Sequence, residues 1–268
     1  MEKIKCILGD EWKLDTVNSD EFDGDALNTE RWYDYAPGWR GRKEFLYKKN
    51  NVAVSDGKLL LTARCIDPSE MEPEDLADGI LPRTMPFVKS RNKVLYGYFE
   101  CLSKGCNAEV RNAFWLYDPL SDDQQAKHSP GNCSEEIDIY EFIGRFRNDE
   151  HAPYVVNAAV HRFATPYTEG IVNWVRSVLP KSNAQLKITE PPSAGFHNYS
   201  LLWTPFEVVW FVDGKEFHRR ENDYFHRPMH ICFNCELARW RGAEVQNFVP
   251  EDSPAVQEIC YFRRWVKE

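Results

Sequence analysis

Apolar residues in this chain recur at every second position in nearly every hydrophobic segment, which is the pattern of a half-buried β-strand. Two such segments flank the dipeptides Asp56-Gly57 and Asp213-Gly214, which suit the left-handed positions of a two-residue hairpin turn. No long amphipathic helix is visible. About ten short strands separated by turn residues are typical of a β-sandwich or barrel, so the sequence predicts an all-β fold of the jelly-roll kind. Beyond the two hairpins, the alternating segments are 94–100, 113–117, 136–141, 155–163, 199–203, 231–236 and 259–265.

We expect one domain over residues 1–268, with one long excursion at residues 67–86. This stretch contains four prolines and six acidic residues, and only a short helical turn around residues 74–76 is expected in it. Loops of this length are often functional, and a solvated surface loop is the alternative.

Charge and hydropathy exclude several classes of partner. There are 33 Lys and Arg residues against 42 Asp and Glu residues, giving a net charge of −9 that repels nucleic acid and anionic lipid. No window approaches the roughly 18 consecutive apolar residues of a membrane helix. The first twelve residues contain too short an apolar cluster for a secretory signal, so the sequence predicts no export signal and leaves the compartment open.

Aromatic side chains make up 14% of the residues, more than a core of this size ordinarily needs. Exposed rings on a soluble protein favour flat ligands with apolar faces, of which sugars are the commonest, although a ring-rich β core is the alternative.

The eight cysteines are interpreted as reduced, buried small hydrophobes, because a chain this long does not need a disulfide scaffold. Cys232 and Cys235 form a C-x-x-C pair. They lie in an alternating strand pattern, where positions three apart point to opposite faces, so we do not expect them to share a metal.

Segment 135–142 contains the candidate catalytic carboxylates. In a regular strand Glu136 and Asp138 share one face and the two isoleucines share the other, but the next acid, Glu141, falls one residue out of phase. A β-bulge at Ile139-Tyr140 would restore the phase and place three carboxylates on one face. An acidic face opposed by basic residues is the ordinary alternative. No Lys or Arg follows before Arg145, so we expect repulsion that is not compensated locally and that is kept for function.

Two such glutamates can approach the roughly 5 to 5.5 Å that suits a retaining glycosidase, with one as nucleophile and the other as acid and then base. An aspartate between them would hold a shared proton or hydrogen bond, because closely spaced carboxylates cannot all ionise without raising at least one pKa.

The stretch Glu136-Ile137-Asp138-Ile139-Tyr140-Glu141 resembles the E-x-D-x-x-E signature of glycoside hydrolase family 16. Further resemblances cover nearly the whole chain and are found at residues 20–24, 39–42, 51–59, 96–100, 196–199, Trp203 and 212–215. The resemblance implies a jelly-roll β-sandwich of two antiparallel sheets with a concave substrate cleft. It also implies that Glu136 is the nucleophile, Asp138 the electrostatic assistant and Glu141 the general acid and base.

The resemblance implies a set of substrate-binding residues as well. Trp115 occupies the place where the family stacks a sugar ring, and Trp39 sits in a loop that covers the non-reducing side, beside Arg42. Asn157 and His161 share one face of the strand expected to follow the catalytic strand. Glu236 and Trp240 match positions that bind sugar hydroxyls in the galactan-cleaving branch.

The motif Trp39-Arg40-Gly41-Arg42 looks most like the β-agarase and β-porphyranase branch, which implies an endo-acting, retaining hydrolase of red-algal galactan. A laminarinase-type endo-β-1,3-glucanase, a carrageenase and a non-catalytic carbohydrate-binding sandwich are the alternatives. Arginines at 40, 42, 239 and 241 could bind sulfate esters, although the net negative charge argues against a strongly anionic substrate.

We expect no cofactor and no metal. Family members often bind a structural calcium through an aspartate in the last strand, but Cys260 occupies the matching position and a hard cation prefers oxygen. The expected partner is a polysaccharide or oligosaccharide, and neither a nucleic acid nor a membrane; the protein is expected to be a monomer.

Overall fold

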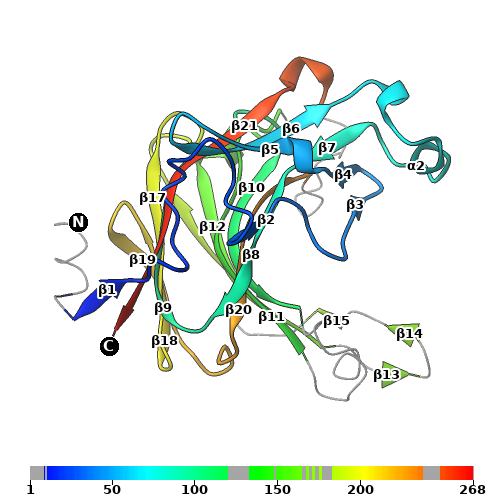
Figure 1. Ribbon diagram of the computed structural model, residues 1–268. Helices are drawn as coiled ribbons and strands as arrows, with labels where there is room; N and C mark the ends of the chain where they lie inside the picture. The colour runs from blue at the N-terminus through cyan, green and yellow to red at the C-terminus, as the bar shows by residue number, and fades with distance from the viewer. Residues whose placement is uncertain are drawn as a thin grey trace.

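The computed structural model describes residues 9, 11–119, 133–147, 149–164, 183–237 and 248–267, with the short segments 167–168, 171–172 and 175–176. Two large sheets pack face to face as a sandwich (Figure 1). The predicted all-β jelly roll is confirmed.

One sheet has eleven strands. Its order is β19-β18-β17-β9-β21-β6-β7-β4-β3, with β1 paired to β21 and β5 paired to β6. The pairing of β4 with β7 is parallel, whereas the other pairings are antiparallel. The strands are β1 Trp12–Leu14, β3 Gly41–Arg42, β4 Phe45–Tyr47, β5 Val52–Ser55, β6 Lys58–Cys65, β7 Arg83–Met85, β9 Gly97–Lys104, β17 His197–Trp203, β18 Glu207–Val212, β19 Lys215–Glu221 and β21 Ala255–Lys267.

The other sheet has eight antiparallel strands in the order β15-β12-β11-β10-β20-β8-β2, with β16 paired to β12. Its centre, β11-β10-β20, carries the candidate site. The strands are β2 Trp32–Tyr33, β8 Phe87–Val94, β10 Arg111–Asp118, β11 Cys133–Ile143, β12 Val155–Ala164, β15 Val175–Arg176, β16 Asn183–Lys187 and β20 Met229–Glu236; β13 Tyr167–Thr168 and β14 Ile171–Val172 form a separate pair.

Both predicted hairpin turns are confirmed. Asp56 and Gly57 have φ values of 52° and 66°, and Asp213 and Gly214 have values of 52° and 77°, as a turn with two left-handed central residues requires. The stretch at residues 67–86 contains the short helix α2 (Pro73–Ala77), as expected, but its end forms strand β7 (Arg83–Met85), which was not expected. The 3-10 helices are Lys49–Asn51, Pro68–Glu70, Ala152–Tyr154 and Pro250–Asp252. Within the described ranges, no helix is both long enough and apolar enough to cross a bilayer.

Aromatic rings from both sheets fill the core of the sandwich. Phe114 of β10 stacks on Phe233 of β20 with a centroid distance of 4.6 Å, and Phe262 of the opposite sheet meets them at 5.7 Å and 5.8 Å. A ring-rich core therefore accounts for many of the aromatic residues in the composition.

The prediction of a single strand over residues 94–100 is wrong. Strand β8 ends at Val94 and β9 begins at Gly97, because Tyr96 and Gly97 take positive φ values of 55° and 131°. A Cβ on Gly97 would lie 2.8 Å from the Trp265 carbonyl oxygen, so the close approach of β21 requires glycine here. Alternating apolar residues run through this corner and concealed it in the sequence.

Among the described cysteine side chains, Cys65, Cys101, Cys106, Cys232, Cys235 and Cys260 are free thiols. In strand β20, Cys232 pairs with Trp115 and Cys235 with Asn112, an odd number of positions apart, so they point to opposite faces as predicted.

Candidate active site

The predicted bulge lies in β11 at Ile139-Tyr140. Opposite β12, Asp138 pairs with Ala159 and Glu141 pairs with Asn157, so two residues of β11 face one residue of β12. Against β10, the register also shifts by one residue between the pairs of Asp138 and Tyr140. The extra residue returns Glu141 to the face of Glu136 and Asp138, while Phe142 is fully buried in the core.

The opposite sheet anchors the bulge from below. The indole Nε1 of Trp210, in β18, donates a hydrogen bond of 2.8 Å to the Asp138 carbonyl oxygen. The Tyr140 hydroxyl accepts from Gln257 at 2.6 Å and also contacts the Ser103 hydroxyl at 3.1 Å. Because the bulge interrupts the ladder, these buried groups supply partners for polar atoms that would otherwise be left unpaired.

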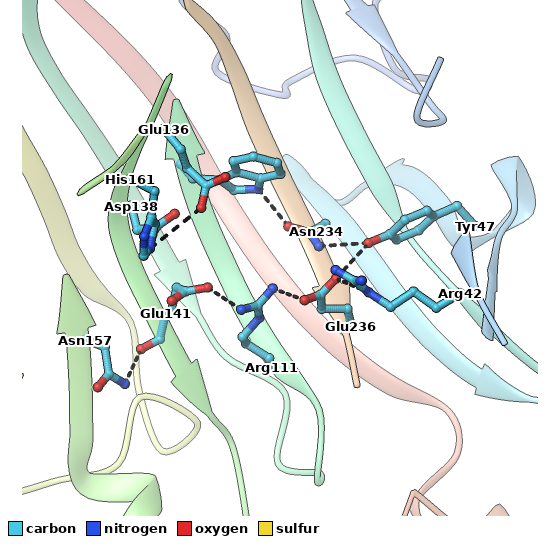
Figure 2. A network of polar contacts seen from close by, with 11 residues as sticks. Arg42, Tyr47, Arg111, Glu136, Asp138, Glu141, Asn157, His161, Asn234 and Glu236 are labelled. Atoms are coloured by element: carbon cyan, nitrogen blue, oxygen red, sulfur yellow. Dashed lines mark hydrogen bonds and ion pairs between the residues drawn. The ribbon is translucent and has the colours of Figure 1, made fainter. Parts of the chain in front are cut away.

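His161 completes the group formed by Glu136 and Asp138 (Figure 2). Its Nε2 atom lies 3.2 Å from Asp138 Oδ2 and 3.9 Å from Glu136 Oε1, because His161 pairs directly with Glu136 across the β11-β12 ladder. The sequence placed His161 near the site, and the structure brings it into contact with the acids. These three side chains also form the possible metal-ligand group found among the described residues, with one ligand atom from each within 4.8 Å of the others.

Burial controls the ionisation of the acids. Burial raises the pKa of Asp138 well above its ordinary value, with the Glu141 charge adding to the effect and Arg111 and a hydrogen bond with Glu136 opposing it. The pKa of Glu136 is raised by burial and by Asp138. Since Asp138 is the more buried of the two, with 3% of its side chain exposed against 19% for Glu136, we infer that Asp138 keeps a proton at neutral pH.

This raised pKa predicts a dependence of stability on pH. Folded protein holds a proton on Asp138 that the unfolded chain releases above about pH 3.9, so the contribution of Asp138 to the free energy of unfolding falls as the pH rises toward its raised pKa. Asparagine has a similar shape and no charge to bury. We expect Asp138→Asn to raise the melting temperature at pH 7, by about 2 to 4 °C for each kcal/mol relieved, and the gain to shrink toward pH 4.

Thermal unfolding of the parent and the variant between pH 4 and pH 8 measures this effect. Asp25→Asn, at an exposed position, is the matched control and should show no such trend. Equal melting temperatures of the parent and Asp138→Asn at neutral pH would show that Asp138 does not retain its proton.

The prediction that the acids lack a compensating cation is wrong. Arg111, in the neighbouring strand β10, places its Nη1 atom 2.6 Å from Glu141 Oε1 and pairs through Nη2 with Glu236 (Figure 2). The cation comes from another strand, so the spacing of charges along β11 gave no sign of it. The alternation of β10, which places Arg111 on the face of Trp115, was the available signal.

Two of the three predicted tryptophans, Trp115 and Trp39, lie in described residues and are partly exposed. Trp115 pairs with Asp138 in the β10-β11 ladder, and its Nε1 donates to Asn234 Oδ1 at 2.8 Å. Trp39 packs its ring edge-on against Tyr47 at 5.0 Å, and the Arg42 guanidinium lies 5.1 Å above the Trp39 ring. The two rings therefore belong to one aromatic region, which also contains Phe87.

The other predicted binding residues already have protein partners. The Asn157 amide donates to the Glu141 carbonyl oxygen at 3.0 Å and accepts from Gln185 at 2.9 Å. Glu236 is held by Arg111, the Tyr47 hydroxyl at 3.3 Å and Arg42 Nε at 3.7 Å. The contacts predicted between the substrate and Asn157 or Glu236 stay predictions. Trp240, Arg239 and Arg241 lie outside the described residues.

A pocket of about 400 Å³ continues from Arg42 toward the loop at residues 67–86. The Nη2 atom of Arg40 donates to both carboxylate oxygens of Asp75 in helix α2, at 2.8 Å and 3.0 Å, and so holds this loop. Arg42 has 46% of its side chain exposed. The pocket is lined by Arg40, Gly41, Arg42, Lys43, Leu46, Asp78 and Ile80.

Known proteins resemble this chain over most of its length. The model of the family 16 domain of β-porphyranases A to D matches residues 12–265. β-Porphyranase B of Zobellia galactanivorans is 30% identical over 212 residues, covering 76% of this chain and 67% of the relative. κ-Carrageenase of Pseudoalteromonas carrageenovora is 27% identical, covering 97% of this chain and 66% of the relative. The chain thus spans about two thirds of the length of these two relatives.

Solved structures show the same fold. The crystal structure of porphyranase B from Zobellia galactanivorans has a TM-score of 0.76 at 24% identity and covers 95% of this chain and 92% of that chain. The structure of the P. carrageenovora κ-carrageenase with a κ-carrageenan oligosaccharide has a TM-score of 0.73 at 25% identity, with 96% of each chain covered. From the family match over nearly its whole length, the chain belongs to glycoside hydrolase family 16 and is an endo-glycosidase of that family.

Proposed function

We propose that this protein is a retaining endo-β-galactanase that cleaves red-algal galactan of the agarose or porphyran type by double displacement. The observation that carries the mechanism is the bulge at Ile139-Tyr140, which aligns Glu136, Asp138 and Glu141 on one face of the sheet. The family model and the β-porphyranase relatives support a galactan as the substrate.

In the first half of the reaction the Glu136 carboxylate attacks the anomeric carbon and Glu141 donates a proton to the leaving oxygen. Asp138, which shares a hydrogen bond with Glu136, orients the attacking oxygen. In the second half Glu141 takes a proton from water, the water oxygen bonds to the anomeric carbon, and Glu136 leaves as a carboxylate.

We assign substrate binding to the aromatic region next to these acids. Trp115 and Trp39 offer partly exposed ring faces on which pyranose rings can stack, and Arg42 lies at the Trp39 ring with its guanidinium accessible. The proposed steps use carboxyl groups as nucleophile, acid and base, so they need no cofactor.

A panel of porphyran, agarose, κ-carrageenan and laminarin tests the substrate. We expect oligosaccharides of intermediate size from porphyran or agarose, because an open sheet face with several aromatic contacts binds the interior of a polymer. Chromatographic sizing of the products measures the result, with Glu136→Gln as the inactive control. Release from laminarin alone would support the glucanase alternative, and binding without any release would support a non-catalytic sandwich.

A further inference from the structure

Arg111 lies between two carboxylates on the face of the sheet that carries the acids. Its Nη1 atom is 2.6 Å from Glu141 Oε1, and its Nη2 atom pairs with Glu236 Oε1. Arg111 and Glu236 are direct partners across the β10-β20 ladder, whereas Glu141 lies two residues from the β11 partner of Arg111, Ile143. A long side chain reaches such a diagonal neighbour. Figure 2 shows the three groups in a row.

Glu236 is the fixed end of this row. Only 5% of its side chain is exposed, and Oε2 accepts from the Tyr47 hydroxyl at 3.3 Å and faces Arg42 Nε at 3.7 Å. The Tyr47 hydroxyl in turn accepts from the Asn234 amide at 3.1 Å. A carboxylate with this many partners in a buried site has little freedom to move.

Glu141 is the other end, and its surroundings are mostly acidic. Glu136 and Asp138 face it from its own strand, Glu236 faces it through Arg111 from β20, and from β12 the Asn157 amide holds its backbone carbonyl oxygen. Arg111 is therefore the cation in contact with the Glu141 carboxylate among the described residues.

We propose that Arg111 is a positioning residue for Glu141, and that Glu236 serves to hold Arg111. This inference rests on the proposed role of Glu141 as acid and base. When the leaving group departs, Glu141 becomes a carboxylate among other acids. The Arg111 guanidinium stabilises this ionised form and keeps it aimed at the incoming water.

Arg111 acts in the second half of the reaction. Glu141 removes a proton from water, the water oxygen forms a bond to the anomeric carbon, and the bond from that carbon to Glu136 breaks with its electron pair passing to the Glu136 carboxylate. Without Arg111, we expect this step to slow because the base is displaced and its charge is uncompensated.

The test uses Arg111→Met, which keeps the side-chain length and removes the charge, on the dinitrophenyl β-glycoside of an oligosaccharide released by the parent enzyme. This leaving group needs little acid assistance, so water attack limits turnover. We expect kcat to fall about 10- to 100-fold, and added sodium azide, a nucleophile that needs no base, to restore several-fold of it. Glu236→Gln should change kcat in the same direction by less, and Arg111→Lys should be intermediate.

Arg219→Met is the matched control, because Arg219 also bridges two glutamates, Glu207 and Glu216, but on β19 of the other sheet. It should match the parent. Parent-like turnover of Arg111→Met would overturn the proposal, as would a loss that azide leaves unchanged.

Crystal structures of the parent and Arg111→Met test the same inference without any substrate. We expect the Glu141 carboxylate to move by about 1 Å or more in the variant, a displacement that is costly in an active site. An unmoved carboxylate would overturn the positioning role. If the polysaccharide panel shows no hydrolysis, the proposed function fails, and this comparison still decides whether Arg111 holds Glu141.

Discussion

Glu136→Gln is expected to abolish hydrolysis, with a loss of about 10⁴-fold or more, while polysaccharide binding persists. Glutamine fills the same volume beside Asp138 and His161, but its amide cannot form the glycosyl-enzyme bond. The aromatic region around Trp115 and Trp39 is unchanged by this substitution. Reducing-end assays measure the first quantity, and affinity electrophoresis in gels containing the cleaved polysaccharide measures the second.

Glu216→Gln, on the exposed strand β19, is the matched control and should behave as the parent. The configuration of the first product formed by the parent, followed by proton NMR, gives an independent check. A double displacement requires the β configuration to be retained. Parent-like turnover by Glu136→Gln, or an α product from the parent enzyme, would remove Glu136 from the nucleophile's role.

The bulge at Ile139-Tyr140 was predictable because it depends only on the residues of one strand. The period of two places Glu136 and Asp138 together and leaves Glu141 out of phase, and one inserted residue is the smallest change that reconciles the acidic face with the apolar one. The hairpins at Asp56-Gly57 and Asp213-Gly214 were predictable for the same reason, since each depends on neighbouring residues only.

Contacts between strands were not predictable in this way. Arg111 reaches Glu141 from β10, and Trp210 bonds to the Asp138 carbonyl from the opposite sheet, some 70 positions away in the sequence. Nothing in the spacing along a strand specifies which strand becomes its neighbour. The resemblance to family 16 supplied the neighbours of β11, and this is why His161 was placed near the acids.

Weak alternation of apolar residues explains why strands β8 and β4 were not predicted. Strand β8 contributes Phe87 to the aromatic region, yet the middle of its sequence, Phe87–Val94, has polar residues on both faces and so little apolar alternation. The alternation of apolar residues therefore gave no signal for this strand. Tyr47 in the short strand β4 was missed for a similar reason, because three residues carry no period.

Glu141→Ala is expected to reduce the hydrolysis of polysaccharide by about 10²- to 10⁴-fold, because a sugar leaving group requires a proton. The loss should be small for the first half of the reaction with a dinitrophenyl leaving group, which departs without one. The glycosyl-enzyme then accumulates, since water attacks slowly without a base. Azide should restore turnover and yield a glycosyl azide of β configuration, because it attacks the intermediate from the side that Glu141 vacated.

The configuration of that azide product distinguishes the two glutamates. If Glu141 were the nucleophile, azide would occupy its place and attack the substrate directly, and the product would have the α configuration. The same measurement on a Glu136 variant with its side chain shortened to alanine should give that α product. Rescue of Glu141→Ala with a β product, together with α product from Glu136→Ala, therefore assigns base and nucleophile in one pair of experiments, and the reverse pattern would exchange the roles assigned here to the two ends of the bulge.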